Sequence, residues 1–182
     1  MTTDLRFEAI GGLNIRELLL LRHGKSGRPA GVADFDRPLK KRGIRNARQI
    51  GEWLAANDLV PDLCVSSTAA RAADTAWHAC DAMDLEETRL QFEPRLYLPD
   101  LNTLLAVVHG LPESFARVLL VSHNPGSEDF AVEFAQPTTI PSGESRHLPT
   151  AALVAFRLDE VWRDAGWGRA TRLARILPRE LS

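Results

Sequence analysis

A chain of 182 residues is long enough for one domain with its own hydrophobic core, and we expect a single domain over residues 1–182. Its composition, 45% apolar and 25% charged, excludes a collagenous, coiled-coil or mainly disordered protein. The net charge is −2 and the arginines are scattered along the chain, so we expect no nucleic-acid partner.

Two features of the sequence bear on location. Residues 1–14 lack the basic stretch followed by an apolar stretch that marks a secretory signal. No apolar run approaches the roughly 20 residues that a membrane-spanning helix needs. We therefore expect a cytoplasmic protein with no membrane partner.

Predicted strands and helices alternate along the chain. An apolar run at Glu17–Leu21 predicts a strand that ends at Arg22-His23-Gly24. Apolar side chains then recur every three or four residues, which predicts an amphipathic helix. In order, the predicted elements are a strand at 17–21, a helix at 40–57, a strand at 63–66, a helix at 70–83, a strand around Leu90 and Phe92, a helix at 101–109, a strand at 118–121, a helix at 128–134, and strands at 151–158 and 170–176.

This alternation determines the predicted fold class. Helices of ten or more residues between successive strands imply crossover connections and hence parallel pairing. The sequence therefore predicts an α/β fold, a three-layer α/β/α sandwich around a mainly parallel sheet. The loop at 136–149, rich in Pro, Thr, Ser and Gly, is expected to be the most mobile segment.

Two histidines follow the ends of predicted strands. His23 comes after the first strand, and His123 comes after the strand at 118–121. In open α/β sheets ligands bind outside the carboxyl ends of the strands, so both side chains are candidates for one crevice. Taken alone, either histidine could instead be a residue that ends a strand and has no role in binding.

Two arginines are expected at the same edge of the sheet. Arg22 directly precedes His23, and Arg71 begins the helix that follows the strand at 63–66. A guanidinium presents a rigid fork of donors suited to a phosphoryl group, and a helix N-terminus adds oriented N–H groups. Arg71 alone would be interpreted as a surface residue, but with the two histidines the arginines predict a phosphate site.

The sequence predicts neither a metal nor another cofactor. Cys64 and Cys80 have neither zinc-ligand spacing nor a secretory context, so we expect buried free thiols. His, Asp and Glu residues also form no cluster at metal-ligand spacing.

Three motifs in this order resemble those of the histidine phosphatase superfamily, which includes the phosphoglycerate mutases and acid phosphatases. They are LRHGKS (21–26), SSTAARAADT (66–75) and VSHNPG (121–126). Arg37-Pro38-Leu39, Leu96-Tyr97 and Pro149-Thr150-Ala151-Ala152 are similar to its SixA-like branch of small phosphohistidine phosphatases. The resemblance covers most of the chain and implies a phosphoglycerate mutase-like fold.

The resemblance also implies a metal-independent phosphatase. His23 would attack phosphorus and form a phosphohistidine intermediate, which water then hydrolyses. Arg22 and Arg71 would neutralise charge on the non-bridging oxygens, and His123 would donate a hydrogen bond to the same group. All four residues are therefore candidate catalytic residues, and the two arginines are also candidates for substrate binding.

Two further candidates lie in loops. Arg37 is the best of the residues after the nucleophile for substrate contact, whereas Asp34 and Asp36 are interpreted as turn formers. His147, in the loop at 136–149, is a weaker candidate for reaching the pocket.

The chain departs from larger members of the family at the general acid, a glutamate shortly after an Arg-Leu pair. Here Arg95-Leu96 is followed by Tyr97-Leu98-Pro99-Asp100. Asp100 and Glu93 carry carboxyl groups, but Asp100 is placed to cap the next helix and Glu93 to lie on the surface. An alkoxide leaves poorly without an acid, whereas a protonated imidazole leaves easily, which favours phosphohistidine on a phosphorylated protein as the substrate.

Two alternatives stay open. A phosphomonoesterase could act on a small phosphorylated metabolite that carries its own proton donor. A non-catalytic module that recognises phosphate is disfavoured, because both His23 and His123 are present.

Overall fold

The computed structural model describes residues 15–181, so the segment 1–14, on which the prediction about a secretory signal rests, lies outside the described residues. Six strands form one sheet in the order β3-β2-β4-β1-β5-β6. Their bounds are β1 Arg16–Arg22, β2 Leu63–Ser66, β3 Leu90–Phe92, β4 Arg117–Ser122, β5 Leu153–Leu158 and β6 Thr171–Ile176. No helix within residues 15–181 is long and apolar enough to cross a membrane.

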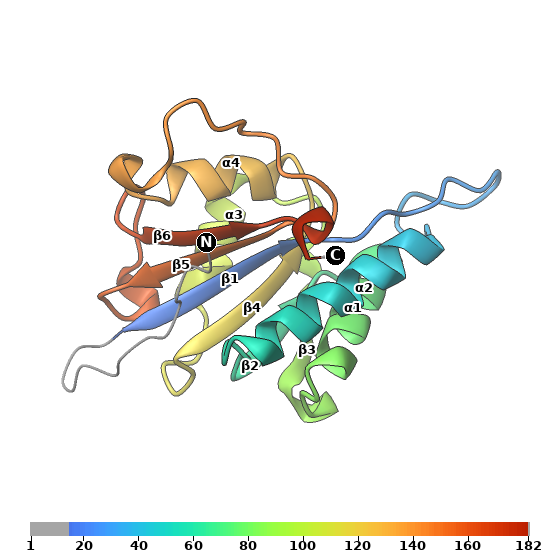
Figure 1. The fold of residues 1–182 in the computed structure, drawn as a ribbon, viewed down its shortest axis with the longest axis horizontal. Coiled ribbons are helices and arrows are strands. Elements are labelled where there is room, and N and C mark those ends of the chain that lie inside the picture. The colour runs from blue at the N-terminus through green and yellow to red at the C-terminus, as the bar shows by residue number, and fades with distance from the viewer. Residues whose placement is uncertain (1–14, 182) are drawn as a thin grey trace.

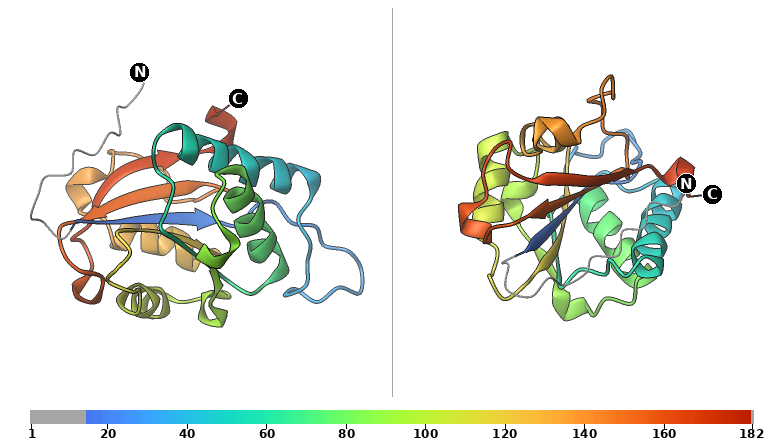
Figure 2. Two further views of the ribbon diagram at one scale, coloured as in Figure 1. Left: turned by 90° about the horizontal axis from the view of Figure 1, so that it is seen from below. Right: turned by 60° about the vertical axis from the view of Figure 1, so that its left-hand side comes forward.

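Helices cover both faces of this sheet, as Figures 1 and 2 show. Helices α1 (Lys41–Ala56) and α2 (Ala70–Ala82) pack together on one face. Helices α3 (Leu101–His109) and α4 (Gly126–Glu133) lie on the other. The three-layer α/β/α prediction is confirmed.

Strand β1 explains why the core has two halves. Leu18 and Leu20 belong to the apolar cluster under α3 and α4, whereas Leu19 and Leu21 belong to the cluster under α1 and α2. All four are at most 1% exposed. Successive side chains of a strand point to opposite faces, so a strand covered on both sides needs an unbroken apolar run.

Parallel pairing dominates the sheet. Strand β1 is parallel to β4, and β2 is parallel to both β4 and β3. Strand β5 is antiparallel to both of its neighbours, β1 and β6. The mainly parallel prediction is confirmed, and the reversed strand β5 makes the sheet mixed.

The late strand begins two residues after its predicted start. Ala151 has a φ of +59°, a left-handed conformation that cannot continue a strand. Its backbone N–H donates to the carbonyl oxygens of Arg22 and His23, at 3.0 and 3.1 Å. The end of the loop at 136–149 is thus fastened to the edge of the sheet where β1 ends.

Candidate active site

The two histidines lie together because β1 and β4 are neighbours that end in register. Arg22 pairs with Ser122, and the backbone N–H of His23 donates to the carbonyl oxygen of Ser122 at 3.0 Å. The ring centroids of His23 and His123 are 4.9 Å apart. Both imidazoles are buried, with 7% and 0% of their surface exposed. One phosphoryl group can therefore contact both rings.

Both arginines reach the same edge of the sheet. Arg71 lies in the first turn of α2, directly after β2, and is buried. Its Nε lies 3.3 Å from Nε2 of His23. Arg22 lies at the end of β1, where its Nη1 donates to the carbonyl oxygen of Leu148 at 2.6 Å. The structure thus brings together all four residues that the sequence predicted for a phosphate site.

The loop after His23 is pressed against the start of α1. A Cβ on Gly43 would lie 2.4 Å from the carbonyl oxygen of Lys25, and a Cβ on Gly24 would lie 2.9 Å from that of Gly43. Glycine is therefore required at both positions for this close approach. The N–H of Gly24 also donates to Oγ1 of Thr75 on α2, at 2.8 Å. These contacts hold His23 in place from both helices.

Hydrogen bonding determines the tautomer of His23. Its Nδ1 lies 2.7 Å from the carbonyl oxygen of Gly24, which can only accept, so Nδ1 carries the proton. The lone pair on Nε2 is then directed toward Arg71. Burial, together with the positive charges of Arg71 and Arg22, lowers the pKa of His23 to about 4. His23 is therefore neutral at pH 7, as a nucleophile must be.

His123 is also kept neutral. Burial, followed by the charges of His23 and Arg71, lowers its pKa to about 3. Its Nε2 lies 2.8 Å from Oγ of Ser67, and its buried Nδ1 has no hydrogen-bond partner among the described residues. An N–H at this Nδ1 would be free to donate to a bound phosphoryl group.

These shifts predict that the free energy of unfolding falls on acidification below pH 6.5. In the unfolded chain a histidine takes up its proton near pH 6.5. In the folded chain His23 and His123 stay neutral until about pH 4 and about pH 3. The unfolded chain therefore binds more protons below pH 6.5, and the stability lost by pH 3 is on the order of a few kcal/mol. Urea unfolding at a series of pH values measures this slope.

The variant His123→Gln should lose less stability than the wild type over the same pH interval. A matched control is His78→Gln, on α2 and outside the site, which should keep the wild-type dependence. An identical pH dependence for His123→Gln and the wild type would contradict the prediction.

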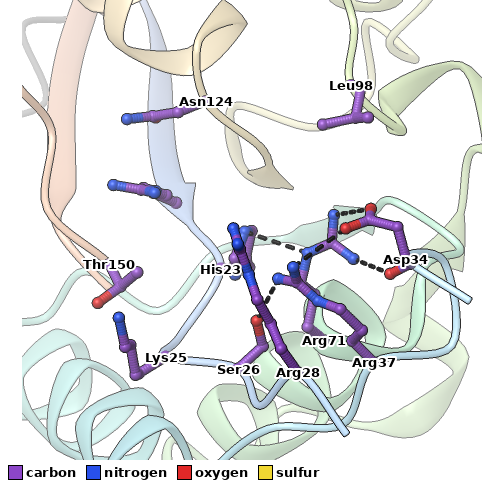
Figure 3. A pocket seen from close by; sticks show the side chains of 11 residues that line it. His23, Lys25, Ser26, Arg28, Asp34, Arg37, Arg71, Leu98, Asn124 and Thr150 are labelled. Atoms are coloured by element: carbon purple, nitrogen blue, oxygen red, sulfur yellow. Dashed lines mark hydrogen bonds and ion pairs between the residues drawn. The ribbon is translucent and has the colours of Figure 1, made fainter. Parts of the chain in front are cut away.

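The pocket in front of His23 has a volume of about 310 Å³ and is strongly cationic (Figure 3). Five positively charged side chains line it, namely Arg22, Lys25, Arg28, Arg37 and Arg71. Among the described residues that line it, Asp34 is the single carboxylate. The pocket therefore suits an anionic ligand.

Asp34 does more than form a turn, which corrects the interpretation from sequence. Its Oδ2 accepts hydrogen bonds from Nη2 of Arg71 and from the Tyr97 hydroxyl, both at 2.9 Å. Its Oδ1 lies 3.1 Å from Nη1 of Arg37. The hydrogen bond from Tyr97 and the charge of Arg71 lower the pKa of Asp34, so the side chain is a carboxylate.

Sequence reasoning also passed over Lys25, Arg28 and Tyr97 as individual site residues. Lys25 and Arg28 are cations within five residues of the nucleophile, and this proximity is a signal that could have found them. Tyr97 is the one tyrosine of the chain, and its ring packs edge-on against His123 with centroids 5.5 Å apart. Tyr97 is far from His23 along the chain, so its position beside the site could not be predicted from the sequence.

The two loop candidates separate clearly. Arg37 lines the pocket, and its Nη2 donates to Oγ of Ser26 at 2.6 Å. His147 does not line the pocket, and its Nδ1 lies 3.2 Å from the Glu128 carboxylate. Arg37 therefore lines the pocket and His147 does not, and substrate contact by Arg37 stays a prediction.

The two candidate acids are occupied elsewhere. Asp100 accepts a hydrogen bond from the backbone N–H of Thr103 at 2.7 Å, as the cap of α3. Glu93 accepts from Nε and Nη2 of Arg95, at 3.0 and 2.8 Å. These hydrogen bonds lower the pKa of each carboxyl group. Neither residue lines the pocket, which agrees with the structural roles expected from sequence.

Among the residues that the structure describes, the remaining ligand-type side chains form no further centre. Cys64 and Cys80 are free and buried, as expected. Within residues 15–181, no group of three or more His, Cys, Asp and Glu side chains is arranged to hold a metal ion.

Comparison with known proteins gives consistent similarities. Residues 18–97 match the model described as the histidine phosphatase superfamily (branch 1). The uncharacterised protein MT1313 of Mycobacterium tuberculosis (strain CDC 1551 / Oshkosh) is 31% identical over 163 residues, which cover 87% of this chain and 100% of that protein. The candidate phosphohistidine phosphatase SixA from Nakamurella multipartitia is 26% identical with a TM-score of 0.77, over 90% of this chain and 96% of that chain. Its counterpart from Agrobacterium tumefaciens is 26% identical with a TM-score of 0.72, over 90% and 98%.

Proposed function

The chain belongs to the histidine phosphatase superfamily and is a phosphatase of that type, and we propose that it hydrolyses phosphohistidine on a phosphorylated protein, with His23 as the nucleophile. The observation that supports the substrate assignment is that the described residues lining the pocket include no carboxylic acid able to protonate an ester leaving group. Asp34 is ionised, and Glu93 and Asp100 are bound elsewhere.

The first step uses the neutral imidazole of His23. The lone pair on Nε2 attacks phosphorus, the bond from phosphorus to the leaving group breaks, and its electron pair goes to the leaving group. The hydrogen bond from Nδ1 to the Gly24 carbonyl oxygen keeps the ring oriented as positive charge develops on it. The ring stays buried, which limits the orientations that it can adopt.

The surrounding donors stabilise the charge on the phosphoryl oxygens. Arg22 and Arg71 supply guanidinium N–H groups at the pocket, and Arg37 lines it as well. His123 is fully buried and is not among the residues that line the pocket. In the tautomer whose Nε2 accepts a hydrogen bond from the Ser67 hydroxyl, its Nδ1 would carry an N–H for the phosphoryl group. Donors fixed before the reaction stabilise the transition state without reorganisation at the moment of transfer.

The second step returns the enzyme to its starting state. A water molecule attacks the phosphoryl group on His23, its OH joins phosphorus, and its proton passes to solvent. The P–N bond breaks and the electron pair returns to Nε2. The low pKa of His23 favours this step, because the ring leaves as the neutral form that burial stabilises.

The candidate substrates differ in whether their leaving group needs a proton from the enzyme. Phosphohistidine protonated on its second ring nitrogen releases neutral imidazole and needs no acid. A phosphate ester releases an alkoxide, for which proton transfer by a side chain commonly contributes about 10²–10⁴-fold in rate. The described lining of the pocket offers no carboxylic acid for this transfer.

The proposal is tested by measuring kcat/KM for a phosphohistidine peptide and for a panel of small phosphate monoesters at matched concentration. Assays contain EDTA, because the proposed chemistry needs no metal. We expect kcat/KM for the phosphohistidine peptide to exceed that for the alkyl monoesters by about 10²-fold or more. A higher value for a small alkyl monoester would instead favour the metabolite phosphatase, and phosphate binding without any turnover would favour a recognition module.

A further inference from the structure

We propose that Asp34 selects the leaving group of the reaction, by accepting a hydrogen bond from the departing nitrogen base and thereby favouring phosphoramidates over phosphate esters. This inference rests on the proposed function and deepens it, since it assigns the substrate preference to one side chain.

Three donors fix the carboxylate of Asp34 at the pocket. Arg71 and Tyr97 hold its Oδ2, each at 2.9 Å, and Arg37 holds its Oδ1 at 3.1 Å. The backbone carbonyl oxygen of Asp34 also accepts from Nη1 of Arg71 at 2.5 Å. In Figure 3 the guanidinium of Arg71 lies between His23 and Asp34. The carboxylate therefore has a defined place beside the reacting group.

Asp34 retains acceptor capacity for a ligand. A carboxylate has about four lone-pair sites, and the side chains described here fill three of them. The side chain is half-exposed and lines the pocket, on the loop after β1 that projects beyond the sheet in Figure 1. A leaving group in the pocket can reach this carboxylate from the open side.

Asp34 can accept a proton-bearing group but cannot supply a proton. The hydrogen bond from Tyr97 and the nearby charge of Arg71 stabilise its ionised form. A proton on the carboxyl group would remove its negative charge and weaken both of these interactions. Asp34 is therefore not suited to be the general acid, and it provides an anionic hydrogen-bond acceptor instead.

This acceptor matches an imidazole leaving group. As Nε2 of His23 bonds to phosphorus, the P–N bond of the substrate breaks and its electron pair remains on the ring nitrogen. The ring leaves as neutral imidazole because its second nitrogen already carries a proton, and Asp34 accepts a hydrogen bond from that N–H. An ester oxygen would instead develop negative charge close to the carboxylate, which is unfavourable.

The test compares Asp34→Asn with Asp36→Asn. Asp36 is exposed on the same loop, and its side chain has no hydrogen bond or ion pair within residues 15–181. Its replacement removes the same charge two residues away. We expect Asp34→Asn to lower kcat/KM for a phosphohistidine peptide by about tenfold or more, the scale of one hydrogen bond to a charged group. Its kcat/KM for p-nitrophenyl phosphate should fall by a smaller factor, because Asp34 also holds Arg71 and Arg37, so the ratio of the two kcat/KM values should fall. Asp36→Asn should change neither value by more than about twofold.

Two results would overturn the inference. Equal losses on both substrates, together with weaker binding of inorganic phosphate in calorimetry, would show that Asp34 acts only by holding Arg71. An unchanged ratio of the two kcat/KM values would show that Asp34 does not discriminate.

Failure of the proposed function would look different. In that case the wild type itself would not turn over the phosphohistidine peptide. The role of Asp34 is then tested with inorganic phosphoramidate, a substrate that also releases a nitrogen base. Asp34→Asn should still lower its turnover relative to that of p-nitrophenyl phosphate, and no change in this ratio would overturn the role of Asp34.

Discussion

Replacing His23 by alanine should abolish the phosphoenzyme and lower kcat by about 10⁴-fold or more, the scale on which enzymes lose activity with their nucleophile. The physical reason is that the His23 imidazole is neutral at pH 7 and its Nε2 faces Arg71, which binds the phosphoryl group in the proposed mechanism. The measurement is a rapid quench in alkali with a labelled phosphorylated substrate, because phosphohistidine survives alkali and is destroyed by acid.

Two controls make this result interpretable. His78→Ala, on α2, removes a histidine outside the site and should label like the wild type. Circular dichroism and binding of inorganic phosphate show whether His23→Ala is folded with its remaining donors in place. Labelling of His23→Ala, or label on Ser66, Ser67 or Cys64 in the wild type, would contradict the assignment of the nucleophile.

Replacing Arg71 by alanine should slow formation of the phosphoenzyme by about a hundredfold or more, the effect of removing one transition-state donor. Arg71 is buried and contacts both His23 and Asp34, so no nearby side chain can take its place without rearrangement. Because Arg71 forms no bond to phosphorus, the labelled intermediate should still be detectable. Single-turnover labelling over time measures the rate.

Arg71→Lys and Arg48→Ala complete this series. Lysine keeps the charge but not the planar fork, so it should restore only part of the rate. Arg48 lies on α1 and pairs with Asp81 at 3.1 Å, and its replacement should leave the rate unchanged. A rate for Arg71→Ala within twofold of the wild type would remove Arg71 from the mechanism. Complete loss of labelling, with the fold intact, would instead contradict the distinction between nucleophile and clamp.

The order and type of the elements could be predicted from sequence because each apolar pattern reports local burial. The run Leu18–Leu21 has no polar interruption, and in the structure its side chains are buried on both faces of the sheet. The reversed direction of β5 was not predictable in this way. It depends on the course of the preceding loop, which brings Ala151 to the end of β1 so that β5 runs back along it. An apolar pattern is the same for a strand in either direction.

The sequence by itself determined that His23, His123, Arg22 and Arg71 share one edge of the sheet, because parallel strands place their carboxyl ends side by side. Their catalytic roles stay predictions until the variants are measured. Only the tertiary structure decided the place of Asp34, whose partners Arg71 and Tyr97 lie 37 and 63 residues away along the chain. A carboxylate in a loop forms a turn or lines a pocket according to which distant donors the packing brings to it, and those contacts exist only once the chain has folded.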